Sequence, residues 1–165
     1  MWYAILGAVL LAGDQILKYW VVTHLAVGES APFLPGFMQL TRLHNYGAAR
    51  PSFSGRTVLL VVFTAVLLAV VALLLLKKVV RHWTGITACT LILSGGIGNI
   101  IDRIVHGYVV DMFDLQLFSY PVFNLADCCV VVGAILGGIY YLFLYEKYDK
   151  KKKESDHAHD PSDPS

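Results

Sequence analysis

The chain has 165 residues and a formal net charge of +1 at pH 7. Hydrophobic residues make up 56% of it, charged residues only 15%, and the mean hydropathy is +0.61, whereas an ordinary soluble domain has about 25% charged residues. The near-zero charge removes any charge-based case for a nucleic-acid partner, and apolar residues gathered in blocks indicate a single domain in a bilayer rather than a large soluble core.

Four stretches are long and apolar enough to span a bilayer, which takes about 20 largely apolar residues. We expect helices at about residues 2–27, 57–77, 83–104 and 124–145. The first contains Asp14 and Lys18, and it opens Met-Trp-Tyr without the basic start and small-residue cleavage site of a signal peptide. We therefore expect it to be retained as a membrane helix.

The segments between and after these helices are more polar. Residues 28–57 are rich in Pro and Gly and include an alternating stretch at 37–41, which predicts a small β-element on the membrane surface. The stretch 112–118 has the pattern of a short amphipathic segment lying in the interface. We expect residues 1–146 to form the membrane domain and the charged tail, residues 147–165, to be solvated and mostly disordered.

The basic residues predict how the chain is oriented. Eight of the 13 Lys and Arg lie between the second and third helices or in the tail, against four in the two long connections. Because basic residues are enriched in cytoplasmic loops, both termini should be cytoplasmic and residues 28–57 and 104–126 should face outward. The three cysteines, Cys89, Cys128 and Cys129, lie in apolar stretches at spacings that suit neither a disulfide framework nor a zinc site, so we expect packing roles.

With this orientation, the polar residues of the apolar segments gather near the outer leaflet. They are Asp14, Lys18, Asn99, Asp102, Arg103, Asp111, Asn124 and Asp127. Structural roles account for several: Asp14 and Lys18 are four apart on one helix face and can pair, Asp102 and Arg103 can be interfacial residues, and Asn124 can cap the fourth helix. Asp111 and Asp127 have no unclaimed basic partner nearby once Arg103 is assigned to Asp102, which favours a functional role.

Two neighbouring aspartates cannot both ionise cheaply, so the pair holds a shared proton. The charged member can activate water and the neutral member can donate to a carbonyl oxygen, which is what peptide hydrolysis without a covalent intermediate requires. Ser94 has no nearby His, the six histidines form no HExxH helix, and we expect neither a metal nor a cofactor. A non-catalytic proton or ion carrier, or a lipid-binding protein, stays open as the alternative, although carriers usually place carboxylates near the midplane of repeated halves.

Four short motifs follow one another in order. Asp14 to Lys18 matches D-x-x-x-K, Asn45 to Ala49 matches N-x-G-A-A, Gly95 to Asp111 matches G-G-x-x-G-N-x-x-D-R…G-x-V-x-D, and Phe123 to Asp127 matches F-N-x-A-D. Each string alone is weak. Together, on a four-helix chain of this length, they resemble lipoprotein signal peptidase, or signal peptidase II, across about residues 10 to 140.

The resemblance implies an aspartyl endopeptidase that removes the signal peptide from diacylglyceryl-modified bacterial prolipoproteins just before the lipidated cysteine. It implies that Asp111 and Asp127 are catalytic. The implied substrate-binding residues are Asn45, Gly47, Asn99, Arg103 and Asn124, and the implied supporting residues are Asp14, Lys18 and Asp102. The implied fold is an all-α membrane protein of four transmembrane helices with a small extracytoplasmic β-cradle and a short interfacial helix, a monomer in the bacterial cytoplasmic membrane among its lipids.

One departure from the family pattern follows the second motif. The family usually has an aromatic and then a small residue there, whereas this chain has Arg50-Pro51, with Phe53 shortly after. Arg50 is placed to reach lipid headgroups and Phe53 to replace the aromatic contact, or the loop geometry and substrate preference differ. The departure affects loop contacts and leaves the aspartates untouched.

Overall fold

The computed structural model of the chain describes residues 1–47 and 54–150. Its helices are α1 (Trp2–His24), α2 (Ser54–Leu76), α3 (Trp83–His106) and α4 (Leu125–Ile139), which continues as the π-helical stretch η1 (Tyr140–Lys150). Its strands are β1 (Ser30–Leu34), β2 (Met38–Asn45) and β3 (Val109–Leu115). The expected Arg50-Pro51 departure and the tail from residue 151 lie outside the described residues.

Four helical segments are long and apolar enough to cross a membrane: Trp2–His24, Thr57–Leu76, Trp83–His106 and Leu125–Asp149. In a bilayer every backbone polar group must find a partner within the protein, and an apolar helix satisfies that requirement by itself. α2, with only 6% of its most apolar stretch buried, presents nearly its whole surface outward, as a lipid-facing helix does. The expected four-helix membrane fold with a small sheet is confirmed.

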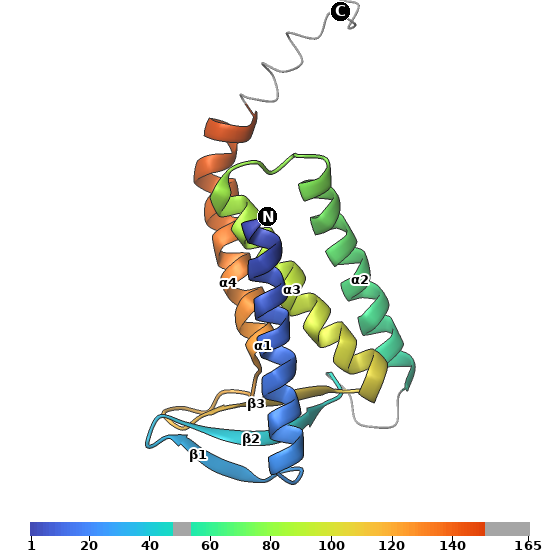
Figure 1. Cartoon of the computed structure of the whole chain (residues 1–165), viewed down its shortest axis with the longest axis vertical. Helices are drawn as coiled ribbons and strands as arrows, with labels where there is room; N and C mark the ends of the chain where they lie inside the picture. The colour runs from blue at the N-terminus through green and yellow to red at the C-terminus, as the bar shows by residue number, and fades with distance from the viewer. Residues whose placement is uncertain (48–53, 151–165) are drawn as a thin grey trace, which may run out of the picture.

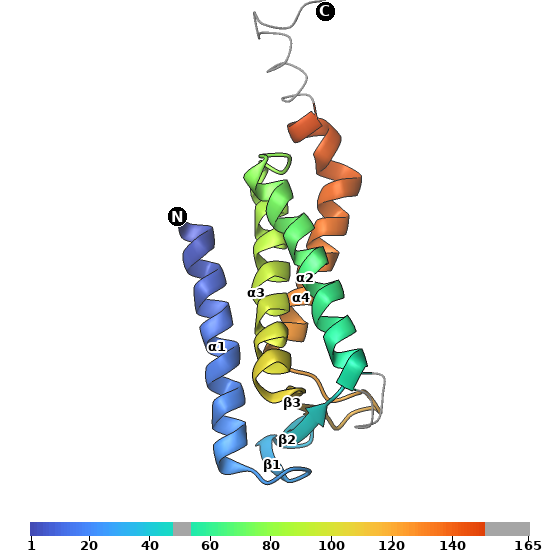
Figure 2. The same cartoon turned by 90° about the vertical axis from the view of Figure 1, so that its right-hand side faces the viewer.

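α3 is the centre of the bundle and packs against α1, α2 and α4. Half of its membrane-spanning stretch is buried, and Figure 2 shows α1 and α2 on opposite sides of it. The close approach of α4 depends on Gly95, because a Cβ there would lie 2.3 Å from the backbone oxygen of Ala126. The stretch of small residues around Gly95, Ser94-Gly95-Gly96-Ile97-Gly98, is therefore a helix-packing surface.

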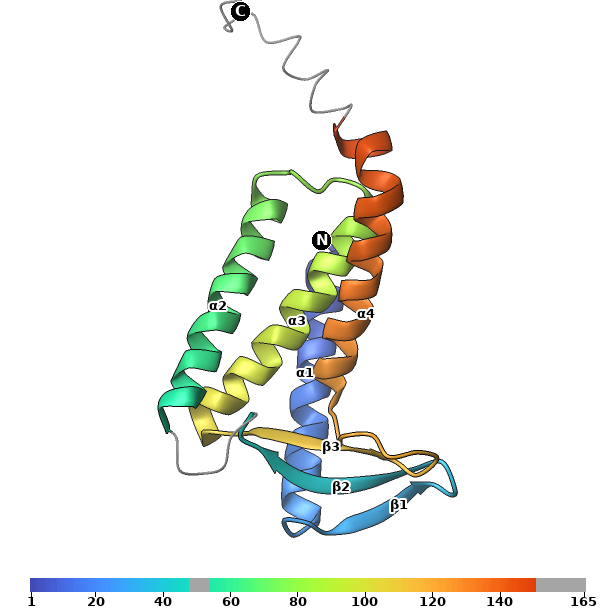
Figure 3. The same cartoon turned by 180° about the vertical axis from the view of Figure 1, so that it is seen from behind.

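The three strands form one antiparallel sheet in the order β1-β2-β3 at the end of the bundle opposite the N terminus (Figures 1 and 3). Asn45 of β2 pairs with Val109, and Leu43 pairs with Asp111, so the sheet fixes Asp111 beside β2. A core of Val21, Leu25, Val110 and Met112 joins the end of α1 to the sheet. The β-element expected at 37–41 is thus confirmed as part of a larger sheet.

Two expectations about polar segments are wrong. The stretch 112–118 is not a separate amphipathic segment, because it belongs to β3 as far as Leu115. The short interfacial helix that the resemblance implied does not occur among the described residues. The backbone groups of this stretch pair instead with β2 and with Phe123, which an isolated one-turn helix cannot match. Nor is the start of the tail solvated, because η1 continues through Lys150 and buries Asp149, whose Oδ2 accepts hydrogen bonds from the backbone of Arg81 and His82.

Helix ends also differ from the expected bounds. α1 ends at His24 rather than near Val27, because Leu25 is extended and Gly28 adopts a positive φ of 83° before β1 begins. α3 continues to His106, where Gly107 closes the helix in the left-handed conformation with φ 80°. Cys89, Cys128 and Cys129 are free thiols in the bundle, which fits the packing role expected of them.

Candidate active site

The site lies where α1, α3 and α4 meet the sheet, at the end of the bundle opposite the N terminus. Asp111 enters from β3, which starts after the sharp turn at Gly107, and Asp127 enters from the first turn of α4. Asp111 is 1% exposed and Asp127 is half-buried. A carboxylate buried to this degree in a membrane protein needs partners for its lone pairs.

Asn124 connects the two aspartates. Its Nδ2 donates to Asp111 Oδ1 at 2.7 Å, and its backbone N–H donates to Asp127 Oδ2 at 3.2 Å. Its Oδ1 accepts from the backbone N–H of Asp127 at 2.9 Å, which completes a reciprocal capping box at the start of α4. The N-cap role considered for Asn124 is confirmed, and the same cap holds both carboxylates against one residue.

Two further asparagines donate hydrogen bonds to the remaining carboxyl oxygens of the two aspartates. Asn45 Nδ2 donates to Asp111 Oδ2 at 2.8 Å, and Asn99 Nδ2 donates to Asp127 Oδ1 at 2.8 Å. Each carboxyl oxygen of the pair therefore receives one hydrogen bond. The amide orientations are fixed on the opposite side, since Asn45 Oδ1 accepts from the Gly47 N–H and Asn99 Oδ1 accepts from the Lys18 ammonium.

Gly47 is needed at the turn that aims Asn45. Its φ is +80°, and a Cβ at this position would lie 2.6 Å from Leu60 Cδ1 on α2. A larger residue would be strained in the left-handed conformation and would also push α2 away. The resemblance implied a substrate-binding role for Gly47, and the structure places this residue where the loop passes close to α2.

A buried ionic cluster supports the site from behind. Lys18 Nζ lies 2.8 Å from Asp14 Oδ2 and 3.0 Å from Asp102 Oδ2, and all three residues are at most 3% exposed. Asp14 Oδ1 also accepts from the Ala126 N–H in the first turn of α4, and Asp102 Oδ2 accepts from the Val110 N–H in β3. The cluster therefore anchors both backbone segments that carry Asp111 and Asp127.

The expected pair of Asp14 with Lys18 is confirmed, whereas the assignment of Arg103 to Asp102 is wrong. Lys18 reaches Asp102 because α1 crosses α3 at this level. Arg103 forms no ion pair with Asp102: it donates from Nη1 to the Asn99 carbonyl oxygen at 3.2 Å, and it interacts electrostatically with Asp127 and Asp111 first and with Asp102 less. It is the basic partner that the spacing along the chain did not reveal.

One residue of the cluster was missed from the sequence. Gln15 Nε2 donates to Asp14 Oδ2 at 3.2 Å and to Asp102 Oδ1 at 3.3 Å, so it connects the two supporting carboxylates. The available signal was an amide side chain next to Asp14 within a spanning helix, where polar residues require buried partners.

The electrostatics of Asp111 differ from those of a surface carboxyl. Its pKa is raised from the ordinary value of 3.8 to about 6, mainly by burial and also by repulsion from Asp127, against the opposing effect of the hydrogen bond from Asn45. No group of three or more His, Cys, Asp and Glu suited to a metal occurs in residues 1–47 and 54–150. Two carboxyls on shared donors, one of them with a raised pKa, have the properties needed to activate water and protonate a carbonyl oxygen.

Known proteins resemble the chain over nearly its whole length. A family model described as Signal peptidase (SPase) II matches residues 6–143. The lipoprotein signal peptidase of Enterococcus faecalis is 39% identical over 151 residues, which cover 92% of this chain and 93% of the relative. That of Clostridium acetobutylicum is 36% identical over 141 residues, which cover 84% and 92%.

Solved structures agree with these sequence matches. A bacterial membrane enzyme solved by the in meso method at 1.9 Å resolution superposes with a TM-score of 0.79 and 30% identity, covering 86% of this chain and 93% of its own. A second, at 2.3 Å resolution, gives a TM-score of 0.74 and 26% identity, covering 99% and 94%.

Proposed function

The chain belongs to the signal peptidase II family, and from this premise we propose that Asp111 and Asp127 form its catalytic pair. It is an aspartyl peptidase that processes prolipoproteins, and a multi-pass membrane protein. Neither the family match nor the relatives support the alternative of a proton or ion carrier or a lipid-binding protein. The residues that carry out the reaction are proposed from the geometry of this chain.

The observation that carries the proposal is that Asn124 donates hydrogen bonds to both aspartates, from its side chain to Asp111 and from its backbone N–H to Asp127. Two carboxyls that bond to the side chain and the backbone of one residue lie close enough to act on the same small molecule. A catalytic pair of this kind needs fixed orientation before substrate arrives, because misplacement of about 1 Å can lower the rate about 100-fold.

The two aspartates have different surroundings, which assigns them different roles. Asp127 lies in the first turn of α4, where the positive end of the helix dipole favours a negative charge. Asp111 is nearly fully buried, and its pKa is raised to about 6. We therefore assign Asp111 the role of holding the shared proton and Asp127 the role of accepting a proton from water.

The reaction then proceeds without a covalent intermediate. Asp127 takes one proton from water as the oxygen attacks the scissile carbonyl carbon, and Asp111 gives its proton to the carbonyl oxygen, which forms a gem-diol. The diol returns a proton to Asp111 as the C–N bond breaks, and Asp127 gives its proton to the departing amine. The new carboxyl ends the signal peptide, and the amine becomes the N terminus at the diacylglyceryl-modified cysteine.

The three asparagines of the site differ in how many of their amide hydrogens are already used in hydrogen bonds. Asn124 Nδ2 donates to Asp111 and to Asn99 Oδ1, so both of its amide hydrogens are used. Among the described residues, Asn45 and Asn99 each use one amide hydrogen on a carboxylate and retain one for a substrate carbonyl. Asn124 is thus a positioning residue, and Asn45, Asn99 and Arg103 are the candidates for substrate contact beside Gly47.

The location suits a lipid-bound substrate. With the orientation expected from the basic residues, both termini are cytoplasmic and the site lies near the outer leaflet, where the signal helix and acyl chains already hold the scissile bond. We expect the enzyme to be a monomer that the substrate enters laterally between helices. This route avoids moving the acyl chains into water, which would cost about 0.8 kcal/mol per CH2 group.

A cleavage assay in detergent with a diacylglyceryl-modified precursor tests the assignment. We expect Asp111→Asn and Asp127→Asn to abolish cleavage while the protein stays folded. The matched control is Asp114→Asn, because Asp114 lies on the same strand but bonds Gln39 and Thr41 away from the pair. Normal turnover by either active-site variant would refute the proposal, and proton flux in liposomes without cleavage would favour the carrier.

A further inference from the structure

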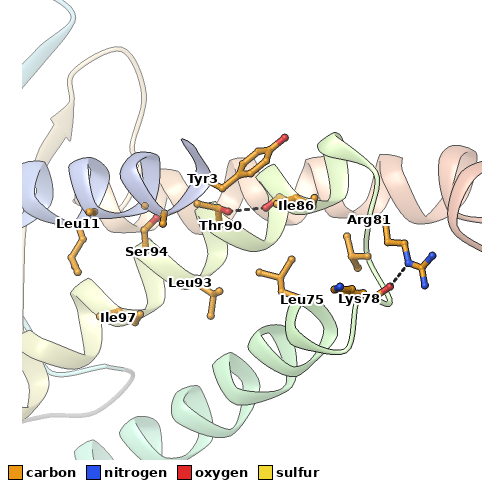
Figure 4. A pocket seen from close by; sticks show the side chains of 14 residues that line it. Tyr3, Leu11, Leu75, Lys78, Arg81, Ile86, Thr90, Leu93, Ser94 and Ile97 are labelled. Atoms are coloured by element: carbon orange, nitrogen blue, oxygen red, sulfur yellow. Dashed lines mark hydrogen bonds between the residues drawn. The ribbon is translucent and has the colours of Figure 1, made fainter. Parts of the chain in front are cut away.

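A cavity that includes neither Asp111 nor Asp127 lies towards the end of the bundle where the chain begins. It occupies about 680 Å³ between α1, α2 and α3, within the range of about 300–1,000 Å³ typical of ligand sites. Figure 4 shows the lining side chains, among them Leu11 of α1 and Lys78 at the loop after α2. α1 and α2 both pack on α3, and the groove opens between them.

The wall of this groove is suited to hydrocarbon. Its lining is apolar apart from Thr90, Ser94, Tyr3 and the basic residues at one end. Thr90 Oγ1 donates to the Ile86 carbonyl oxygen at 2.8 Å, and Ser94 Oγ donates to the Leu91 carbonyl oxygen at 3.1 Å. These two hydroxyls are satisfied within α3, so they require no polar partner from an occupant.

The length of the groove matches one leaflet. Its α3 wall runs from Ile86 to Ile97, which at a rise of about 1.5 Å per residue spans about 16 Å. The hydrocarbon core of a bilayer is about 30 Å thick, so the groove extends through about half of it. A spanning helix of another protein would need the whole thickness, whereas one acyl chain needs only this half.

The mouth of the groove carries positive charge. Lys78 lies there, exposed, and its ammonium forms no hydrogen bond or ion pair within residues 1–47 and 54–150. Lys78 also adopts a positive φ of 54°, a conformation that disfavours any residue with a Cβ and that glycine would adopt without strain. The chain thus keeps a lysine where the backbone favours glycine.

A signal peptidase meets two apolar molecules that could occupy this groove, a signal peptide and a phospholipid, and the charge of Lys78 favours one of them. A signal peptide begins with a basic segment, which Lys78 at this end would repel. An anionic phospholipid instead presents a phosphate at the same depth, where each nearby Lys or Arg contributes about 1 kcal/mol of attraction.

We propose that this groove binds one acyl chain of an anionic phospholipid whose phosphate contacts Lys78. With the proposed orientation the lipid belongs to the inner leaflet. The binding itself depends neither on that orientation nor on the catalytic assignment, so its failure would leave the catalytic pair unaffected.

The test uses the full chain in neutral detergent, titrated with phosphatidylglycerol or with phosphatidylcholine of the same acyl chains. Bound lipid is counted by native mass spectrometry, and thermal unfolding is followed in parallel. Lys78→Gly should lower the apparent affinity for phosphatidylglycerol about fivefold and leave that for phosphatidylcholine unchanged. In lipid-free detergent the same variant should unfold at a higher temperature than wild type, because glycine relieves the strain at φ 54°.

Matched variants separate the charge from the groove. Lys77→Gln removes the neighbouring charge outside the lining and should change nothing, whereas Ala8→Leu should weaken binding of both lipids by filling the groove. Ala12→Leu, on the same helix but outside the lining, controls for bulk. The proposal is overturned if Lys78→Gly keeps the preference for phosphatidylglycerol, or if Ala8→Leu slows precursor cleavage without weakening lipid binding, which would assign the groove to the substrate.

Discussion

Replacing Lys18 by methionine tests how the buried ionic cluster supports the catalytic pair. Methionine keeps the length of the side chain and removes the charge. The ammonium lies 2.8 Å from Asp14 and 3.0 Å from Asp102. It also donates to Asn99 Oδ1 at 3.2 Å. Without it, two carboxylates that are each 1% exposed lose their only ion-pair partner among the described residues.

The structure sets the expected magnitude. Removing one partner of a buried ion pair typically destabilises a protein by about 3–5 kcal/mol, because the remaining charge is left uncompensated. In a chain of 165 residues, this corresponds to a fall in Tm of about 10 °C. Asn99 Oδ1 also loses one of its two donors and keeps only Asn124 Nδ2. The amide that donates to Asp127 is then held less firmly, so we expect kcat to fall by about 100-fold in the molecules that remain folded.

Thermal unfolding and precursor cleavage in detergent measure the two effects separately. Adding Asp102→Asn to Lys18→Met removes one uncompensated charge, so it should recover part of the stability. It does not restore the donor to Asn99, so activity should stay low. The reasoning is refuted if Lys18→Met unfolds within 1 °C of the exposed-site control Lys77→Met, or if the double variant regains normal cleavage.

Three further predictions concern single residues. The folded-state pKa of Asp111 is raised to about 6 from 3.8, so its contribution to stability is greatest below about pH 4 and falls by about 3 kcal/mol as the pH rises through about 6. Unfolding measured from pH 4 to 8 should show this fall, Asp111→Asn should flatten it, and kcat/KM should decline over the same pH range. Asn124→Ala removes the cap and two amide donors, so it should lower the unfolding free energy by about 3 kcal/mol and greatly reduce cleavage; wild-type values would contradict the positioning role. Gly95→Ala forces a Cβ against the Ala126 oxygen and should cost about 2 kcal/mol in unfolding measurements, whereas Gly138→Ala, with open space around it, should be neutral or slightly stabilising.

Much of the architecture was predictable because a bilayer imposes a single rule on apolar segments. An apolar run such as 58–76 can pair its backbone polar groups in a bilayer by forming a helix, and its length fits the thickness of the membrane. The sheet was only partly predictable. The stretch 37–41 alternates between apolar and polar residues as a strand does. The sequence of β3 fits a strand and an amphipathic interfacial segment equally well, and only its pairing with β2 shows that it is a strand.

The site divides in the same way. Asp111 and Asp127 were predicted from the motifs, and the contact of Asp127 with Asn124 belongs to the capping box at α4. The contact of Asn124 with Asp111 depends on the tertiary packing of α4 against β3, which the sequence does not show. The partner of Asp102 was not predictable, because Lys18 is 84 positions away along the chain and meets it only where α1 crosses α3. The burial of Asp149 against the loop before α3 escaped prediction for the same reason, since a charged residue in a charged tail carries no sign of a distant partner.

The claim on which the mechanism depends is that Asp111 and Asp127 act as one unit. The most direct measurement is the single-turnover rate of precursor cleavage by the two single Asp→Asn variants and the double variant, each shown to be folded. Residues that act as a unit lose no more together than apart, so all three rates should fall by a similar factor, about 10⁴ or more. If either single variant retains a rate within tenfold of wild type, or if the two losses multiply in the double variant, the shared-pair mechanism is wrong.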